Sequence, residues 1–464
     1  MGMTLKELLT KGEGTLSAQE AKTLAAQCRM DVETLYTLLE ERGIKIIEDE
    51  ADADVNLDVD SIIAEVEKIT SIDQILTGAN PGNITLLGEE FDEIYLNKVH
   101  TLSLSPESVG KFHDMKIAYT PLHGAGVRLV PASLRKWGFT NVSLVEEQAV
   151  IDGNFPTVES PNPEERKTMA KAIELGSRLG ADLVLATDPD SDRIGVALRN
   201  AKGEYVLLNG NQTLSLIMAY QLTRWSELGR LDGKEFVVKT IVTSQMPNVM
   251  AAHFGVKCYD CLTGFKYIAR IIRNNEGKAT YIGGGEESFG YLAGDFVRDK
   301  DAVSACSLVA EAAAWTRDTM GLTLYEWLQK LYVEFGFFRE GLVSVVRKGM
   351  EGAAEIQQMM VDYRADPPRE IAGSPVVKIN DFKLLESTDV RTGAKTPIEE
   401  EASNVLQWFA ADGTVVSVRP SGTEPKIKFY FGVRAELESV ADFDRVEAGL
   451  DAKIETIKKE LKLV

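Results

Sequence analysis

Apolar and polar residues along the chain form two kinds of pattern, and each pattern predicts one kind of element. Short continuous apolar runs predict buried strands, and longer stretches with apolar residues three or four positions apart predict helices. Between residues 106 and 300 the two kinds of segment alternate, which predicts layered α/β domains with parallel neighbouring strands. The predicted strands are 116–119, 142–145, 183–186, 194–198, 235–240 and 281–283, and the predicted helices are 126–137, 164–179, 213–225, 245–254 and 266–274.

The two ends of the chain depart from this alternation. The C-terminal part mixes strand and helix patterns less regularly, which is typical of an α+β domain. The first fifty residues read as helices, with Ser17 and Glu20 at capping-box spacing and Gly43 placed to end a helix. Helical patterns also cover 61–69 and 91–102. We therefore expect an α/β fold: two consecutive three-layer mixed α/β domains plus a C-terminal α+β domain, preceded by a small helical module.

Length, charge and cysteine content narrow the class of protein. The 464 residues suffice for about three domains at roughly 150 residues each. The formal net charge of -20 argues against a general nucleic-acid binder. No apolar run approaches the roughly 20 residues that span a bilayer, and the N-terminal residues are charged where a secretory signal is apolar. The four cysteines indicate a reducing compartment. We expect a cytoplasmic protein with no membrane contact and no direct nucleic-acid contact.

Three aspartates at alternate positions are the strongest chemical signal. Asp188, Asp190 and Asp192 follow the predicted strand 183–186 and precede another apolar run. Crowded carboxylates repel one another, and their hard oxygen atoms suit Mg²⁺. Aspartates at this spacing most often lie in a solvated acidic turn that binds no metal. Here the neighbouring strands, the intervening proline and Arg193 favour a metal loop. A magnesium ion beside an arginine is typical of phosphoryl-group chemistry.

A second loop near the C-terminus has the composition of a phosphate cradle. It combines an arginine fork, two hydroxyl groups and a glycine that lets the backbone approach an anion, and the next strand adds a lysine. An ordinary surface turn is the alternative, and the presence of the aspartate loop favours phosphate binding. The residues expected to hold the phosphate are Arg419, Ser421, Gly422, Thr423 and Lys428.

Three further loops carry weaker signals. The glycine-rich segment 283–291 has no basic residue, and its Glu286 and Ser288 offer acceptors that suit sugar hydroxyl groups. His123 lies in a strand-to-helix loop where it can transfer a proton or meet a phosphate. Lys266 follows a Thr-Gly-Phe sequence and can face an anion. Taken alone, each of the last two is as readily an ordinary structural loop residue.

Taken together and in this order, the loops resemble those of the α-D-phosphohexomutase superfamily, the phosphoglucomutases and phosphomannomutases, over about residues 61–464. The resemblance implies an isomerase that interconverts hexose 1-phosphate and 6-phosphate through a hexose 1,6-bisphosphate, with Mg²⁺ at the three aspartates. It implies Arg193, His123 and Lys266 as catalytic residues, and a cleft also lined by residues 298–301. The implied organisation is a helical module at 1–50, an acidic linker and connecting helices at 51–105, domain II with the metal loop at 106–208, domain III with the sugar loop at 209–338 and domain IV with the phosphate loop at 339–464.

One part of that family's pattern is not found. Its phosphoserine belongs to domain I, in a Thr-Ala-Ser-His-Asn-Pro type loop, and none of the four histidines is followed by Asn-Pro. The opening residues instead resemble region 1.1 of bacterial housekeeping sigma factors, in segments 5–9, 14–17 and 38–44 and in the acidic segment 48–60. We therefore expect that domain I is lost or replaced and that the chain alone has negligible mutase activity. In one reading, a separate chain carries the nucleophile domain.

Two alternatives stay open on the sequence alone. The chain can be a non-catalytic sugar-phosphate sensor whose N-terminal module contacts RNA polymerase, because an acidic linker suits such a module. It can also be a fusion or truncation with no joint function. The sugar loop tolerates both glucose and mannose across the family, so the sequence does not decide between these two sugars.

Overall fold

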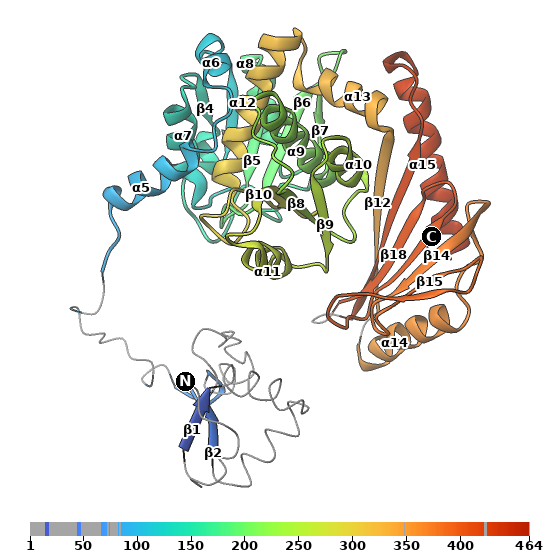
Figure 1. The fold of residues 1–464 in the computed structure, drawn as a ribbon. Coiled ribbons are helices and arrows are strands. Elements are labelled where there is room, and N and C mark those ends of the chain that lie inside the picture. The colour runs from blue at the N-terminus through green and yellow to red at the C-terminus, as the bar shows by residue number, and fades with distance from the viewer. Residues whose placement is uncertain are drawn as a thin grey trace. The chain divides into compact units, whose positions relative to one another are not determined.

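The computed structural model describes residues 14–17, 44–47, 66–71, 74, 82, 85–347, 349–421 and 425–463, and the statements below concern these residues. The chain divides into two compact units, Met1–Leu86 and Leu87–Val464 (Figure 1). In the first unit, strand β1 (Gly14–Ser17) pairs in parallel with β2 (Ile44–Ile47). The helical prediction for the first fifty residues did not include this strand pair. The predicted helices and the acidic segment 48–60 lie outside the described residues.

The first sheet of the second unit has the strand order β4-β3-β5-β6-β7. Side chains at alternate strand positions face two different helices. Tyr119 and Leu185 pack in a cluster with residues of helix α7, whereas Val184 packs in a cluster with residues of α8. The sheet therefore has a covered face on each side, as in a three-layer domain. The elements are β3 (Ile117–Thr120), α7 (Gly126–Trp137), β4 (Val142–Leu144), α8 (Ala170–Leu179), β5 (Leu183–Thr187), β6 (Ile194–Arg199) and β7 (Tyr205–Leu207).

The second sheet has the strand order β11-β10-β8-β9. Helix α11 packs on one face through Phe265 and Ile268, which share a cluster with Phe236 and Val238 of β8. Its elements are α9 (Gly210–Glu227), β8 (Glu235–Thr240), α10 (Met246–His253), β9 (Lys257–Cys261), α11 (Phe265–Asn275), β10 (Thr280–Gly285) and β11 (Tyr291–Ala293).

Helix α12 (Ala302–Met320) joins the two sheets, because it contacts α7 and β5 of the first and α9 and β11 of the second. The segment that precedes strand β3 packs against helix α12 and is hydrogen-bonded to it. That segment contains helices α5 (Glu89–His100) and α6 (Pro106–Lys111). Buried Glu311 of α12 accepts hydrogen bonds from the main-chain N–H groups of Leu104 at 2.9 Å and Ser105 at 3.0 Å.

The C-terminal sheet is antiparallel, with the order β12-β19-β18-β17-β14-β15-β16, and β13 pairs with β14. It contacts the second domain at several points. The Gln407 side-chain amide donates to the carbonyl oxygen of Ile241 at 2.8 Å, and Tyr430 shares a hydrophobic cluster with Ile241 and Leu262. The elements of this part are α13 (Leu324–Phe335), β12 (Phe337–Val346), α14 (Gly349–Ala365), β13 (Glu370–Ile371), β14 (Ser374–Asp381), β15 (Glu386–Asp389), β16 (Lys395–Pro397), β17 (Leu406–Ala410), β18 (Val415–Pro420), β19 (Lys426–Ala435) and α15 (Phe443–Glu460).

The predicted α/β fold class is confirmed for the second unit, with two corrections. Strands β5 and β6 pair antiparallel, not parallel, because the metal loop that joins them is too short for a crossover helix. Helix α8 begins at Ala170 instead of residue 164, and turns occupy the residues between. Among the described residues, no helix is both long and apolar enough to cross a membrane.

Candidate active site

The metal loop is the hairpin turn between β5 and β6. One ligand oxygen from each of Asp188, Asp190 and Asp192 lies within 4.8 Å of the others. Ser191 takes a left-handed conformation with φ of 60° at the tip of the turn. One oxygen of Asp188, Oδ1, accepts the N–H groups of Asp192 at 3.1 Å and Arg193 at 3.0 Å. The loop backbone therefore fixes the first carboxylate and directs the other two toward it.

The electrostatics of this loop are those of a cation site. Asp188 is buried, and burial together with the charges of Asp192 and Asp190 raises the pKa of its carboxyl group to about 7. The Oδ1 atom of Asp192 is buried and has no hydrogen-bond partner. In Mg²⁺ sites the ligand oxygens lie about 2.0–2.1 Å from the ion, so opposite ligands are roughly 4 Å apart. The three carboxylates are close to that separation, and their donor set fits Mg²⁺.

Two glycines of the loop 120–126 hold the metal loop from behind. A Cβ atom on Gly124 would lie 2.3 Å from the Cα of Pro189, and the N–H of Ala125 donates to the Pro189 carbonyl at 2.8 Å. A Cβ on Gly126 would lie 2.7 Å from the Ser191 hydroxyl oxygen. These backbones approach so closely that larger residues at the two glycines would displace the aspartates.

His123 of the same loop is buried and faces inward. Its Nδ1 lies 2.9 Å from the carbonyl oxygen of Val150, and its Nε2 lies 2.8 Å from the Thr157 hydroxyl. Thr157 in turn accepts a hydrogen bond from the Gln148 amide at 2.9 Å. Both ring nitrogens therefore contact the segment 150–157, and among the described contacts none joins the His123 side chain to the aspartates.

Two cations contact the metal loop. Arg193 lies with its Nε 3.7 Å from one oxygen each of Asp188 and Asp192, and its side chain is 38% exposed. Lys300 contacts Asp192 Oδ2 at 2.9 Å through its Nζ. Sequence reasoning placed Lys300 in a segment lining the cleft without giving it a role. The charged run 298–301 was the available signal, but only the fold brings it to the aspartates.

The sugar loop between β10 and β11 touches the metal loop directly. The N–H of Ile194 donates to the carbonyl oxygen of Phe289 at 3.0 Å, and Arg193 forms a β-bridge with Gly290. Glu286 is buried and accepts the N–H of Gly264 at 2.9 Å, and burial raises the pKa of its carboxyl group.

Two predicted residues, Ser288 and Lys266, and one that was not predicted, Glu287, lie around this loop. Ser288 is half-buried in the turn. Lys266 is exposed in the first turn of α11, with its ammonium 5.0 Å from the ring centre of Tyr267. Glu287, which the sequence did not single out, accepts from the hydroxyl groups of Thr240 at 3.1 Å and Thr243 at 3.3 Å. The two neighbouring acids thus differ: one lies beside the metal loop, and the other is tied into its own domain.

Two cations of the phosphate loop lie opposite each other. Arg419 on β18 pairs in register with Lys428 on β19. Directly opposed residues of an antiparallel pair share a face, and like charges there are destabilising. Such a pair is favoured when an anion lies between the cations. The N–H of Ser421 donates to the Lys426 carbonyl at 2.8 Å, and the predicted Gly422 and Thr423 lie outside the described residues.

The phosphate loop lies near the sugar loop. Tyr430 of β19 shares the face of Lys428, and it packs in a hydrophobic cluster with Ile241 and Leu262 of the second domain. Burial raises the pKa of Tyr430 above its usual range, and the charges of Glu287 and Glu286 raise it further. The metal, sugar and phosphate loops therefore surround one region of the unit.

Comparisons with known proteins identify the domains that carry these loops. Residues 93–203 match the phosphoglucomutase/phosphomannomutase alpha/beta/alpha domain II, residues 209–335 match its domain III and residues 377–450 match its C-terminal domain. A phosphoglucomutase of Staphylococcus aureus strain MRSA252 is 33% identical over 417 residues, which cover 89% of this chain and 72% of that protein. The phosphoglucomutase of strain N315 is 34% identical over 393 residues, covering 84% and 68%.

Solved structures show the same fold at low sequence identity. A Thermus thermophilus protein assigned as a phosphomannomutase matches with a TM-score of 0.54 at 18% identity, over 80% of this chain and 66% of that one. The Paramecium phosphoglucomutase parafusin matches with a TM-score of 0.51 at 15% identity, over 80% and 62%. The three matched domains and the two staphylococcal relatives show that this chain belongs to the phosphoglucomutase/phosphomannomutase family.

Proposed function

We propose that this chain binds a hexose phosphate and Mg²⁺ and forms the metal-, sugar- and phosphate-binding part of a phosphohexomutase. The observation that carries the proposal is the carboxylate cluster: three aspartates have oxygens within 4.8 Å of one another, and one buried oxygen, Asp192 Oδ1, has no hydrogen-bond partner. A buried acid of the sugar loop, Glu286, is also present. Hexose 1-phosphate and 6-phosphate are the proposed substrate and product. The choice between glucose and mannose is left open.

In this proposal each loop binds one part of the ligand. Asp188, Asp190 and Asp192 hold Mg²⁺, which when bound offsets negative charge on a phosphoryl group in transfer. Glu286 and Ser288 accept hydrogen bonds from sugar hydroxyl groups. These two acceptors suit a loop that must bind the sugar in two orientations.

The cations divide between two phosphate positions. Arg419 and Lys428, with the described Ser421 and the undescribed Gly422 and Thr423, hold the phosphate that does not react. Arg193 neutralises charge beside the metal loop, and Lys266 faces the anion from the start of α11. The contacts of His123 support a different role from the one predicted: it orders the loop behind the aspartates.

The proposed phosphoryl donor and acceptor is a phosphoserine from outside these 464 residues. A cavity of about 360 Å³ beside the metal loop leaves room for such a group. Asp190 and Ser191 of the metal loop line it, together with Tyr95 and Lys300. A phosphoserine there would lie next to the carboxylates, and without it we expect binding with negligible turnover.

Titration calorimetry tests the binding claim. We expect Mg²⁺ to bind the chain and to strengthen binding of glucose 1-phosphate, and we expect Asp190→Asn to lose both effects. The matched control is Asp114→Asn, because Asp114 is exposed and lies outside the loops of the site. Equal Mg²⁺ binding by the chain and Asp190→Asn would contradict the proposal.

A further inference from the structure

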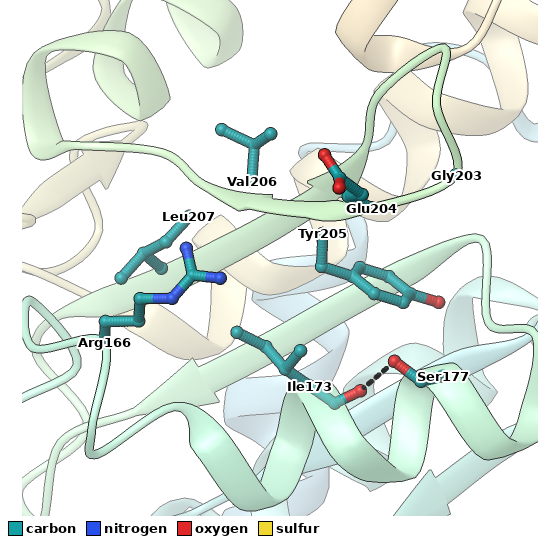
Figure 2. A pocket seen from close by; sticks show the side chains of 8 residues that line it. All are labelled: Arg166, Ile173, Ser177, Gly203, Glu204, Tyr205, Val206 and Leu207. Atoms are coloured by element: carbon teal, nitrogen blue, oxygen red, sulfur yellow. Dashed lines mark hydrogen bonds between the residues drawn. The ribbon is translucent and has the colours of Figure 1, made fainter.

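A groove on the first domain lies outside the loops described above. It has a volume of about 550 Å³ and runs between strand β7 and helix α8 (Figure 2). Helix α8 contributes Ile173 and Ser177, the loop before it contributes Arg166, and residues 203–207 form the other wall. None of these residues belongs to the metal, sugar or phosphate loops, so the proposed mutase function does not account for the groove.

The wall formed by β7 is a free sheet edge. Strand β7 is the last strand of its sheet, next to β6. Glu204 accepts the N–H of Asn200 at 2.9 Å, and Leu208 donates to Val196 at 2.9 Å, so even-numbered residues bond toward β6. In an antiparallel ladder the residues between them direct their N–H and C=O groups away from the partner strand.

These outward-facing residues are Tyr205 and Leu207. Among the residues that the structure describes, none bonds to their main-chain N–H or C=O groups. A free edge of this kind is a template on which another strand can pair. The backbone therefore offers two donors and two acceptors to an extended chain beside β7.

The side chains around this edge differ from one end to the other. Tyr205 and Leu207 share the face toward α8 because strand side chains alternate, and with Ile173 they make an apolar floor. Arg166 lies at the Leu207 end of the groove in Figure 2, whereas the carboxylate of Glu204 lies on the opposite face of β7, away from α8. Within the described part of the chain, Arg166 forms no ion pair. The groove thus has an apolar floor and a free cation at one end.

We propose that this groove binds an extended peptide segment of another protein, which pairs with β7 as an added strand. The peptide places an acidic side chain against Arg166 and, two positions away on the same face, an apolar side chain against Ile173 and Tyr205. The period of two follows from strand geometry, and the acidic position follows from the free guanidinium group of Arg166.

Panning of a phage-displayed library of random short peptides against the full chain tests this proposal. We expect enriched sequences with an acidic residue two positions from an apolar residue. Binding of a synthesised peptide, measured by fluorescence anisotropy, should weaken about tenfold in Arg166→Ala. The matched control is Arg178→Ala, an exposed arginine of helix α8 that does not line the groove, which should bind like the parent.

Amide hydrogen exchange locates the bound peptide. We expect the peptide to protect the N–H groups of Tyr205 and Leu207, whereas Val206 already bonds toward β6 and changes little. Replacing the peptide's acid by its amide should remove the difference between the parent and Arg166→Ala. The proposal is overturned if no sequence is enriched, if Arg166→Ala binds equally well, if protection falls elsewhere, or if the edge pairs only with a second copy of the chain.

Discussion

The close approach between Gly124 and Pro189 gives a sharp test of how the metal loop is held. In Gly124→Ala, the added methyl carbon would lie 2.3 Å from the Cα and 2.5 Å from the carbonyl oxygen of Pro189. Gly124 is not among the residues with positive φ, so the substitution strains no dihedral angle and its effect is steric. Carbon atoms pack at about 3.5–4.0 Å, so Pro189 must move by roughly 1 Å or more.

That displacement has two expected consequences. Pro189 stands between Asp188 and Asp190, so both carboxylates move with it. Metal-ligand distances tolerate about 0.2 Å, and disturbed supporting contacts weaken metal binding by about 10–100-fold. Overpacking costs about 1–3 kcal/mol of unfolding free energy, and the lower entropy of the unfolded alanine chain offsets about 0.4–1 kcal/mol of it. We expect a net loss of about 1–2 kcal/mol.

Titration calorimetry with Mg²⁺ and urea unfolding measure the two effects. Gly110→Ala is the matched control, because Gly110 lies in α6 with no atom within 4 Å of its added carbon. This variant should bind Mg²⁺ like the parent and gain about 0.5–1 kcal/mol of stability. The reasoning is refuted if Gly124→Ala keeps the parent's Mg²⁺ affinity and stability.

Three further variants test other parts of the account. Tyr95→Phe removes a hydroxyl that donates to both oxygens of buried Asp301 at 2.8 Å, so urea unfolding should show a loss of about 1.5–3 kcal/mol, and an unchanged midpoint would contradict it. Arg419→Met should weaken glucose 1-phosphate binding about tenfold while keeping or raising stability, because it relieves repulsion with Lys428; equal affinity would count against the phosphate role. Burial raises the pKa of the Glu340 carboxyl group from 4.5 to about 7. The folded state therefore binds the carboxyl proton more tightly than the unfolded state does, and the protein loses stability as the pH rises from about 4.5 to about 7. Glu340→Gln should therefore be the more stable form at about pH 8, with the advantage vanishing near pH 4; parallel stability profiles would refute this.

Local patterns predicted the elements that position the site. Helix α7 and strand β8 have the predicted bounds, because the apolar spacing that defines them is also the spacing of their buried faces. The aspartate spacing likewise predicted a carboxylate cluster, since the loop that carries Asp188, Asp190 and Asp192 is short enough to hold them together.

Local patterns do not predict which residues far apart in the sequence contact one another. The ion pair of Lys300 with Asp192 depends on how α12 joins the two sheets. The inward orientation of His123 depends on Val150 and Thr157, which no periodicity places beside it. The antiparallel pairing of β5 with β6 follows from the short loop between them, whereas the alternation of strands and helices predicted parallel neighbours.

The central claim is that this chain binds hexose phosphate with Mg²⁺ and depends on an external phosphoserine for turnover. A coupled mutase assay with glucose 1-phosphate, glucose 1,6-bisphosphate and Mg²⁺ tests it most directly. The account predicts negligible turnover for the chain alone, and turnover when a domain carrying the family's phosphoserine loop is added. That gain should be lost in Asp190→Asn and kept in Asp114→Asn. Turnover by the chain alone at the rate of a staphylococcal relative would contradict the account.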